Sequence, residues 1–173
     1  MIVHKFGGTS VGDADRFASV ADILMEQHQG LGDAEREETV AVVSAMSGVT
    51  NRLITGARAA AAGQTSVYRE IKAGLVNQHL EVVETLLQKN SERLNVGGLI
   101  VDRLHELGRF YRSIAMLGEL TARGLDAVTS FGEQLSAAIL AAVLRERGAR
   151  AQALSATALI VTDDGFGAAM PLV

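Results

Sequence analysis

This 173-residue sequence has no cysteine and no tryptophan, a single proline (Pro171), and few aromatic residues, which make up 4% of the chain. Without cysteine the chain can form no disulfide bridge, and it offers no thiolate as a metal ligand or catalytic nucleophile. The scarcity of aromatic residues argues against a surface that stacks nucleic acid bases. The net charge of −4 argues the same way, because nucleic acid binding normally needs a basic face.

The sequence also lacks an apolar run approaching about 20 residues, the length that crosses a membrane. Its N-terminus does not resemble a signal peptide, because Lys5 and the glycines after it interrupt the apolar stretch. Apolar residues still make up 48% of the 173 residues, which is enough for one domain with a hydrophobic core. We therefore expect a cytoplasmic protein with no membrane partner and no nucleic acid partner.

The most informative stretch is the first dozen residues. Ile2 and Val3 start an apolar strand, Lys5 and two glycines follow, and a helical pattern begins at Asp13. Glycines let backbone N–H groups approach a phosphate, a helix N-terminus adds partial positive charge, and a lysine adds a full one. The stretch matches neither a Walker A loop nor the G-x-G-x-x-G fingerprint. On residue chemistry alone, a phosphate site and a purely structural turn are about equally favoured.

The rest of the chain predicts alternating strands and helices. A strand at 39–44 is apolar on successive residues, as in a parallel strand covered on both faces, and 150–155 predicts a third strand. The charged run 33–38 predicts an exposed turn. Helical periodicity extends over residues 13–28, 66–90, 94–120 and 126–147, and we expect the two long middle helices to pair antiparallel. Strands separated by helices form parallel βαβ units, whose ligands bind at the carboxyl ends of the strands.

Four stretches resemble the aspartokinases, within the amino acid kinase family. Lys5-Phe-Gly-Gly-Thr-Ser-Val11 resembles their N-terminal signature, and residues 40–51 resemble their second strand and the loop after it. Residues 130–136 resemble a Gly-Glu helix start, and residues 162–167 resemble a loop near the middle of the kinase domain. The resemblance implies an α/β fold, a three-layer αβα arrangement with a mainly parallel sheet, here truncated and with a long helical pair at about 66–121.

The resemblance further implies that residues 1–173 are the N-terminal part of an amino acid kinase catalytic domain. We expect the ATP-binding C-terminal half and the ACT regulatory region to be absent from this sequence, and the isolated chain to be inactive. An exposed half-sheet edge invites pairing, so we expect a homo-oligomer or association with the missing half.

The implied reaction is transfer of the ATP γ-phosphoryl group to the β-carboxylate of L-aspartate, the first step of lysine, threonine and methionine biosynthesis. By resemblance, Lys5 is catalytic and stabilises charge on the transferred group. Lys5, Gly7, Gly8, Thr9 and Ser10 would bind the ATP phosphates. The implied cofactors are ATP and Mg²⁺, and the metal ligands are expected to lie outside this chain.

The resemblance assigns four residues to L-aspartate: Ser44 and Ala45 line the cavity, Thr50 binds the side-chain carboxylate, and Glu133 holds the α-ammonium. Chemistry alone allows plainer roles. Thr50 or Ser47 could cap a helix, and Glu133, placed near a predicted helix start, could complement the helix dipole.

Asp163 and Asp164 are further candidates, because the resemblance places their loop near nucleotide and substrate; in isolation Asp-Asp-Gly is a turn signal. Two other function classes stay open at this point. One is a different amino acid kinase, acting on glutamate, acetylglutamate or a nucleotide. The other is a non-catalytic αβα remnant that serves as a structural or partner module.

Overall fold

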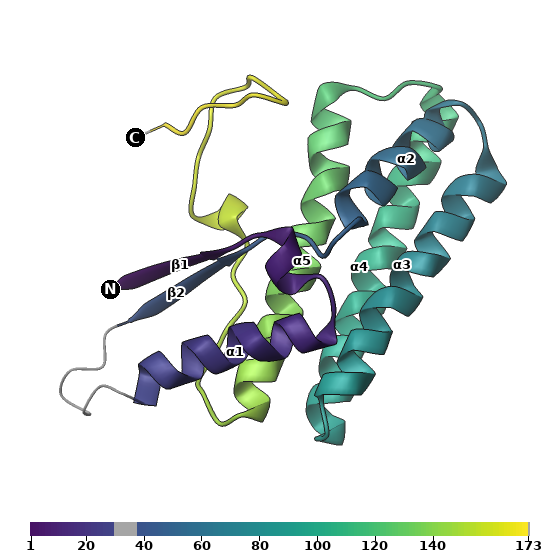
Figure 1. Ribbon diagram of the computed structural model, residues 1–173. Coiled ribbons are helices and arrows are strands. Elements are labelled where there is room, and N and C mark those ends of the chain that lie inside the picture. Colours follow the sequence, from purple (N-terminus) through teal and green to yellow (C-terminus); the bar gives the residue numbers. More distant parts are fainter. Residues whose placement is uncertain (30–37, 173) are drawn as a thin grey trace.

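The computed structural model describes residues 1–29 and 38–172 (Figure 1). Two strands, β1 (Ile2–Phe6) and β2 (Thr39–Val43), pair in parallel. The helices of the described residues are α1 (Ala14–Gln29), α2 (Val49–Ala61), α3 (Thr65–Leu86), α4 (Asn90–Leu117) and α5 (Ala122–Glu146), with short 3-10 helices η1 (Gly8–Val11) and η2 (Ala156–Ala158). The fold is therefore α/β, as expected, with a small sheet. The charged run predicted as a turn falls almost entirely on residues 30–37, outside the described residues.

The predicted parallel pairing of the first two strands is confirmed, but β2 is not covered on both faces. Val40 and Val42 are 43% and 48% exposed, and Val3 on β1 is 57% exposed. Val3 lies opposite Val40, and Lys5 lies opposite Val42, so these four side chains share one open face. An apolar run shows that a strand can be buried on both faces, but it does not show which neighbours are present to bury it.

The predicted third strand at 150–155 is wrong. After α5 the chain continues without regular structure, and no described strand pairs with this segment. Its residues are mainly small or polar, and Leu154, its one large apolar side chain, is 61% exposed. Alanine and glutamine favour strands weakly, so the segment has little to hold it against a sheet.

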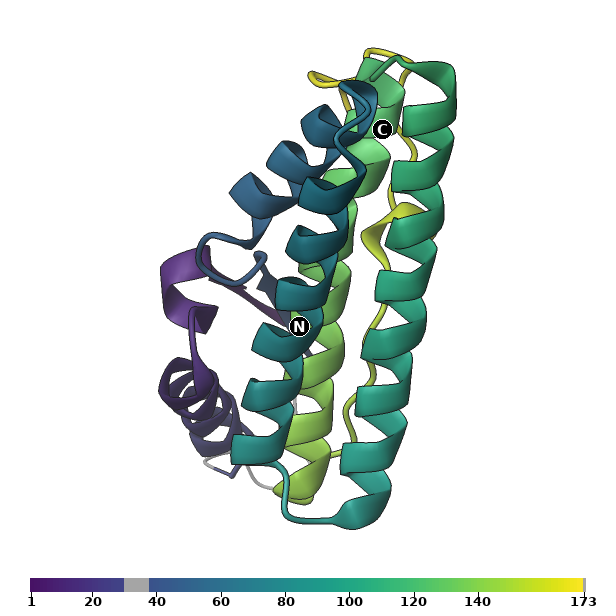
Figure 2. The same ribbon diagram turned by 90° about the vertical axis from the view of Figure 1, so that its right-hand side faces the viewer.

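The two long middle helices, α3 and α4, pair antiparallel as predicted, and α5 lies beside them (Figure 2). The buried face of α4 repeats every three to four residues, including Ile100, Leu104 and Leu107. Tyr111 is fully buried in the same face, and its hydroxyl donates a hydrogen bond to the Leu53 carbonyl oxygen of α2 at 3.1 Å. Burial raises the pKa of this phenol, so Tyr111 is a packing residue that stays neutral.

Helix α5 begins at Ala122, earlier than the sequence pattern predicted. Thr121 caps it, because the Thr121 hydroxyl accepts a hydrogen bond from the Gly124 N–H at 3.0 Å. By length and composition α5 could cross a membrane, but 61% of its apolar stretch is buried in the structure. That is the position of a core helix, and Figure 1 shows α5 between the sheet and the α3–α4 pair.

His79 on α3 is fully buried. Its Nδ1 lies 2.7 Å from the Leu75 carbonyl oxygen, which can only accept, so Nδ1 carries the proton. Its Nε2 has no hydrogen-bond partner among the described residues. Burial lowers the pKa of His79, opposed by the Leu75 hydrogen bond, and the positive charge of Arg52 lowers it further.

His79 should make the free energy of unfolding depend on pH. Because its pKa is lower in the folded than in the unfolded chain, where it is about 6.5, the unfolded state binds the proton more readily. Stability should therefore be greatest above that pH and fall as pH is lowered below it, by at most about 1.4 kcal/mol per pH unit. Urea unfolding from pH 7 to 5 measures this slope. His79→Leu should flatten it, whereas the exposed-site control His105→Gln should leave it in place; equal slopes in His79→Leu and wild type would contradict the assignment.

Candidate functional site

The candidate site begins where the two strands end side by side. The Ser44 N–H donates to the Phe6 carbonyl oxygen at 3.0 Å, which fixes the two loops that follow against each other. Gly7 then adopts an extended conformation and starts η1, and the Ser10 N–H donates to the Gly7 carbonyl oxygen at 2.8 Å. A Cβ at Gly7 would have no atom within 4 Å, so the space in front of this turn is open.

The loop after β2 holds the glycine turn from behind. The Ser47 hydroxyl donates to the Gly8 carbonyl oxygen at 3.2 Å. A Cβ on Gly8 would lie 2.9 Å from the Ala45 carbonyl oxygen, and a Cβ on Gly12 would lie 2.9 Å from Ser47 Oγ. Both glycines therefore allow the two loops to pack closely. This packing explains the glycines structurally, whether or not they also bind phosphate.

Gly132 seats α5 against the same loop. A Cβ at Gly132 would lie 2.5 Å from Ala45 Cβ and 3.3 Å from Val49 Cγ1. Glu133, the next residue, is exposed at the edge of this contact. The sequence placed Glu133 in the first turn of its helix, and this is wrong: α5 starts at Ala122, so Glu133 is too far along the helix to complement the dipole at its N-terminus.

The N-terminus of α2 also opens at this edge. Gly48 caps the helix with a φ of 78°, a left-handed conformation that favours glycine, and no side chain caps this end. The plainer reading of Ser47 or Thr50 as the cap is therefore wrong. Thr50 lies in the first turn, where backbone N–H groups lack partners within the helix and can receive a carboxylate.

Ala45 lies close to both Gly8 and Gly132, so the glycine turn, the loop between β2 and α2, and the middle of α5 meet at one edge. The candidate residues belong to these segments: Thr9 and Ser10 to η1, Ser44 to the loop after β2, Thr50 to α2, and Glu133 to α5. Lys5 is exposed and forms no ion pair within the described part of the chain. Ala45 is an exception, because its side chain is buried against α5 and lines no open space.

Asp163 and Asp164 lie in a separate loop. Oδ1 of Asp163 accepts hydrogen bonds from the N–H groups of Gly165 and Met170, both at 3.0 Å, which holds the turn together. The loop is fixed to the start of α5, where the Gly167 N–H donates to Asp126 Oδ2 at 2.7 Å. No described hydrogen bond or ion pair connects it with the glycine turn.

The sequence analysis missed the role of Arg16, an exposed residue in the first turn of α1. The Arg16 guanidinium donates to the Thr9 carbonyl oxygen, and its Nε lies 3.3 Å from Asp13 Oδ2. Asp13 in turn caps α1, because its Oδ1 accepts from the Arg16 N–H at 3.0 Å. The sequence did offer one indication of this pairing, because an arginine three residues after a capping aspartate can form an ion pair with it. The role of Gly132 had none, since a glycine inside a helix reveals nothing about its packing partner.

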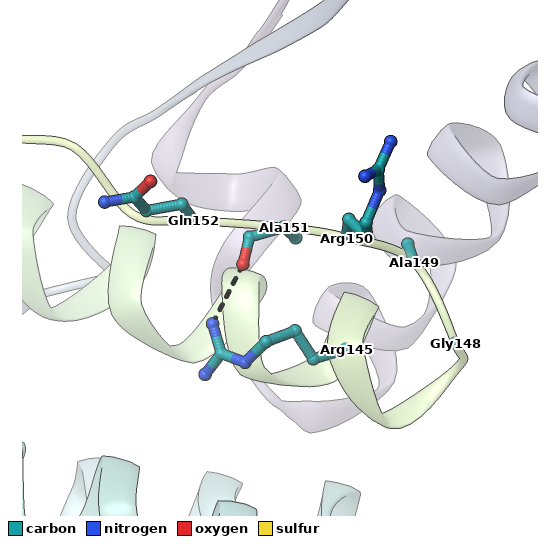
Figure 3. Close-up of a pocket in the computed structure, with 6 residues that line it drawn as sticks. All are labelled: Arg145, Gly148, Ala149, Arg150, Ala151 and Gln152. Atoms are coloured by element: carbon teal, nitrogen blue, oxygen red, sulfur yellow. Dashed lines mark hydrogen bonds between the residues drawn. The ribbon is translucent and has the colours of Figure 1, made fainter.

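Two shallow surface hollows of the described residues lie away from this site. One, of about 600 Å³, lies along α4. The other, of about 520 Å³ (Figure 3), follows the end of α5, where Arg145 donates to the Ala151 carbonyl oxygen at 3.1 Å. Within residues 1–29 and 38–172, no group of three or more histidine, aspartate or glutamate side chains could hold a metal ion. The glycine turn and the N-terminus of α2 lie on an open edge, and both features suit anions.

Comparison with known proteins gives consistent results. The model of the amino acid kinase family matches residues 1–169. Aspartokinase 1, chloroplastic, of Arabidopsis thaliana is 35% identical over 94% of this chain and 27% of its own length. The lysine-sensitive aspartokinase 3 of Escherichia coli is 28% identical over 99% of this chain and 34% of its own length. The crystal structure of E. coli aspartokinase III in complex with aspartate and ADP matches with a TM-score of 0.82 at 27% identity, over 99% of this chain and 34% of that one. The chain thus spans about a third or less of the length of these relatives.

The contact between α5 and the loop after β2 predicts a specific loss of stability. Gly132→Ala places a methyl group against the Ala45 side chain and should lower the free energy of unfolding by about 1–3 kcal/mol. Adding Ala45→Gly should restore part of that loss by making space. The control Gly97→Ala, also inside a helix but with its nearest neighbour at 3.6 Å, should be neutral or raise stability by up to about 1 kcal/mol. Chemical denaturation measures all four proteins; a Gly132→Ala variant as stable as Gly97→Ala would contradict the packing described.

Proposed function

Because this chain belongs to the amino acid kinase family, we propose that it is the N-terminal part of an aspartokinase catalytic domain, with residues that contact ATP phosphates and L-aspartate. The observation that supports the proposal is the close contact of Ala45 with Gly8 and Gly132, which brings together the glycine turn after Lys5, the loop before Thr50 and the part of α5 that contains Glu133. Each is the residue type that its ligand group needs. The complex of the similar E. coli enzyme with aspartate and ADP supports the same two ligand classes.

In this proposal the phosphates lie in front of the glycine turn. Gly7 leaves open space there, so backbone N–H groups of the turn can donate to phosphate oxygens without obstruction. Lys5 precedes the turn, and no described carboxylate neutralises its ammonium group. Phosphoryl transfer depends mainly on positioning and charge stabilisation. Lys5 therefore stabilises negative charge that develops on the transferred group, and Thr9 and Ser10 add hydroxyl donors.

Aspartate lies beside the phosphates, against the N-terminus of α2 and the exposed side of α5. The hydroxyl and N–H groups of the first turn of α2, with Thr50, bind the side-chain carboxylate that attacks the γ-phosphorus. The Glu133 carboxylate holds the α-ammonium group. Ser44 lies between the two loops and lines the same space, whereas Ala45 acts through its backbone position and its contact with Gly132.

The reaction also needs Mg²⁺ to neutralise phosphate charge, and by resemblance its ligands belong to the part of the family domain beyond this chain. We therefore assign no step of this chain to the metal and place its ligands in the part of the family domain that this chain does not span, together with the nucleotide-binding C-terminal half and the ACT region. Asp163 and Asp164 remain candidates only through resemblance. A cytoplasmic location and the place of the reaction in amino acid biosynthesis are part of the same proposal.

Lys5 is tested in a protein that carries the complete kinase domain. Lys5→Ala should lower kcat by about 100- to 1000-fold, because the charge that it supplies develops in the transition state. The KM for aspartate should change little. Arg69→Ala, which removes an exposed positive charge on α3, is the control and should keep wild-type kinetics. Equal losses in kcat and in aspartate affinity would contradict the role given to Lys5.

Glu133 is tested with two ligands that differ in one group. Glu133→Gln should weaken binding of L-aspartate at least about tenfold, because the ion pair with the α-ammonium group is lost. Binding of succinate, which lacks that group, should be unchanged. Isothermal titration of this chain with both ligands gives the comparison, with Glu119→Gln as the exposed control. If Glu133→Gln weakens both ligands equally, Glu133 has a structural role instead.

The isolated chain can be examined directly for turnover. With Mg·ATP and aspartate, and hydroxylamine to trap an acyl phosphate, we expect no product. Aspartate binding without turnover supports a competent partial domain. A folded chain that binds neither aspartate nor nucleotide would overturn the proposal in favour of a structural module.

A further inference from the structure

A positive charge on α1 holds the carbonyl side of the glycine turn. The Arg16 guanidinium donates a hydrogen bond to the Thr9 carbonyl oxygen of η1, seven residues earlier in the chain. Its Nε lies 3.3 Å from Asp13 Oδ2, so the same side chain joins η1 to the start of α1. The Arg16 side chain is 53% exposed, and these polar contacts, more than apolar packing, therefore hold it in place.

A series of hydrogen bonds leads from Arg16 through the turn. The amide group that contains the Thr9 carbonyl also contains the Ser10 N–H, which donates to the Gly7 carbonyl oxygen at 2.8 Å. The amide group of the Gly7 carbonyl in turn contains the Gly8 N–H, for which the described residues provide no acceptor. Arg16 is therefore connected to the Gly8 N–H through two successive hydrogen bonds.

Hydrogen bonds that are connected in this way polarise one another. A cation that donates to a carbonyl oxygen draws electron density from the whole amide group, so the N–H of that amide becomes a better donor to the next carbonyl. Here the effect passes from the Thr9 carbonyl to the Gly7 carbonyl and makes the Gly8 N–H a stronger donor. Each bond in such a series gains about 10–30% in strength.

The same series determines which way the Gly8 N–H points. In a trans amide the N–H and the carbonyl point in opposite directions. Because the Gly7 carbonyl is directed into η1, toward the Ser10 N–H, the Gly8 N–H points away from η1. The space in front of the turn is open, since a Cβ at Gly7 would have no atom within 4 Å.

We propose that Arg16 is a positioning residue for the phosphates of ATP, which orients the glycine turn and strengthens the Gly8 N–H as a donor without touching the phosphates. The inference rests on the proposed function, which places the phosphates in front of this turn. It gives the two cations different tasks. Lys5 acts on the charge that develops during transfer, whereas Arg16 acts through the turn on phosphate that is bound equally in the ground state and in the transition state. Loss of such an interaction raises KM more than it lowers kcat.

Kinetics of a protein that carries the complete kinase domain test this division. Arg16→Gln should raise the KM for ATP about five- to tenfold, and it should leave kcat and the KM for aspartate within about twofold of wild type. Arg16→Lys keeps a cation that can donate to the Thr9 carbonyl, so it should recover part of the ATP affinity. A KM for ATP that stays at the wild-type value in Arg16→Gln would overturn the proposal.

Asp13→Asn is the matched control for the ion pair at the start of α1. Asparagine also caps helices well, so this exchange removes only the carboxylate charge beside Arg16. If Arg16 acts through its charge on the Thr9 carbonyl, Asp13→Asn should keep the KM for ATP or lower it. An equal rise of this KM in Asp13→Asn and Arg16→Gln would show that the ion pair merely supports the helix, which also contradicts the proposal.

A spectroscopic measurement on the ligand-free chain is independent of turnover. In nuclear magnetic resonance spectra of the isotope-labelled chain, the amide proton of Gly8 should move upfield in Arg16→Gln, because its N–H is less polarised. The amide proton of Gly97, on α4, should not move. An unchanged Gly8 signal would show that the series of hydrogen bonds does not reach this N–H.

Lys5→Ala, measured in parallel, separates this inference from the proposed function. If Lys5→Ala loses turnover while Arg16→Gln keeps the wild-type KM for ATP, the positioning role of Arg16 is wrong and the proposed function stands. Wild-type kinetics in both variants would overturn the phosphate site together with the role of Arg16.

Discussion

The candidate site depends on one close contact, the approach of α5 to the loop after β2 at Gly132 and Ala45. Without a side chain at Gly132 the helix can touch the loop, and the loop in turn supports the glycine turn through Ser47 and the Ala45 carbonyl. The glycine turn, the loop after β2 and α5 are far apart in sequence, and these contacts fix their positions relative to one another. The candidate residues Lys5, Thr9, Ser10 and Glu133 are exposed, but the segments that carry them are positioned by small residues that face inward, where packing leaves no room for a methyl group.

The sequence predicted the order of elements well where periodicity was long and strong. The helices α1, α3 and α4 were recognisable from their apolar spacing, and the first two strands from short apolar runs. It failed where the outcome depended on distant partners. Residues 150–155 could not show that no strand would pair with them, and Val40 and Val42 could not show which face would stay open. Helix boundaries were predicted less well than the helices themselves, because local capping decides where a helix begins. Thr121 caps α5, so the helix begins at Ala122 and Glu133 lies well inside it.

The candidate site residues were identified from the family resemblance, and the structure shows which of the segments that carry them are in contact. Lys5, Ser44, Thr50 and Glu133 carry no individual signal in composition, because a lysine after a strand or a glutamate on a helix is common. The segments that carry these residues meet because β1 pairs in parallel with β2 and because α5 packs against the loop after β2, and spacing alone reveals neither contact. Glycine in a sequence indicates only that the backbone has conformational freedom at that position. In the structure Gly8, Gly12 and Gly132 instead allow neighbouring segments to pack closely.

The sheet and the helices differ in how far along the chain their contacts reach. Helices α2 to α5 are consecutive, so most of their contacts join neighbouring elements across short loops, and such contacts form early in folding. Pairing of β1 with β2 must close a longer loop that contains α1, and the glycine turn depends on that pairing. The candidate binding edge combines the glycine turn after β1, the loop after β2 and the middle of α5. It therefore has its shape only when the N-terminal strand and the run of consecutive helices are packed against each other.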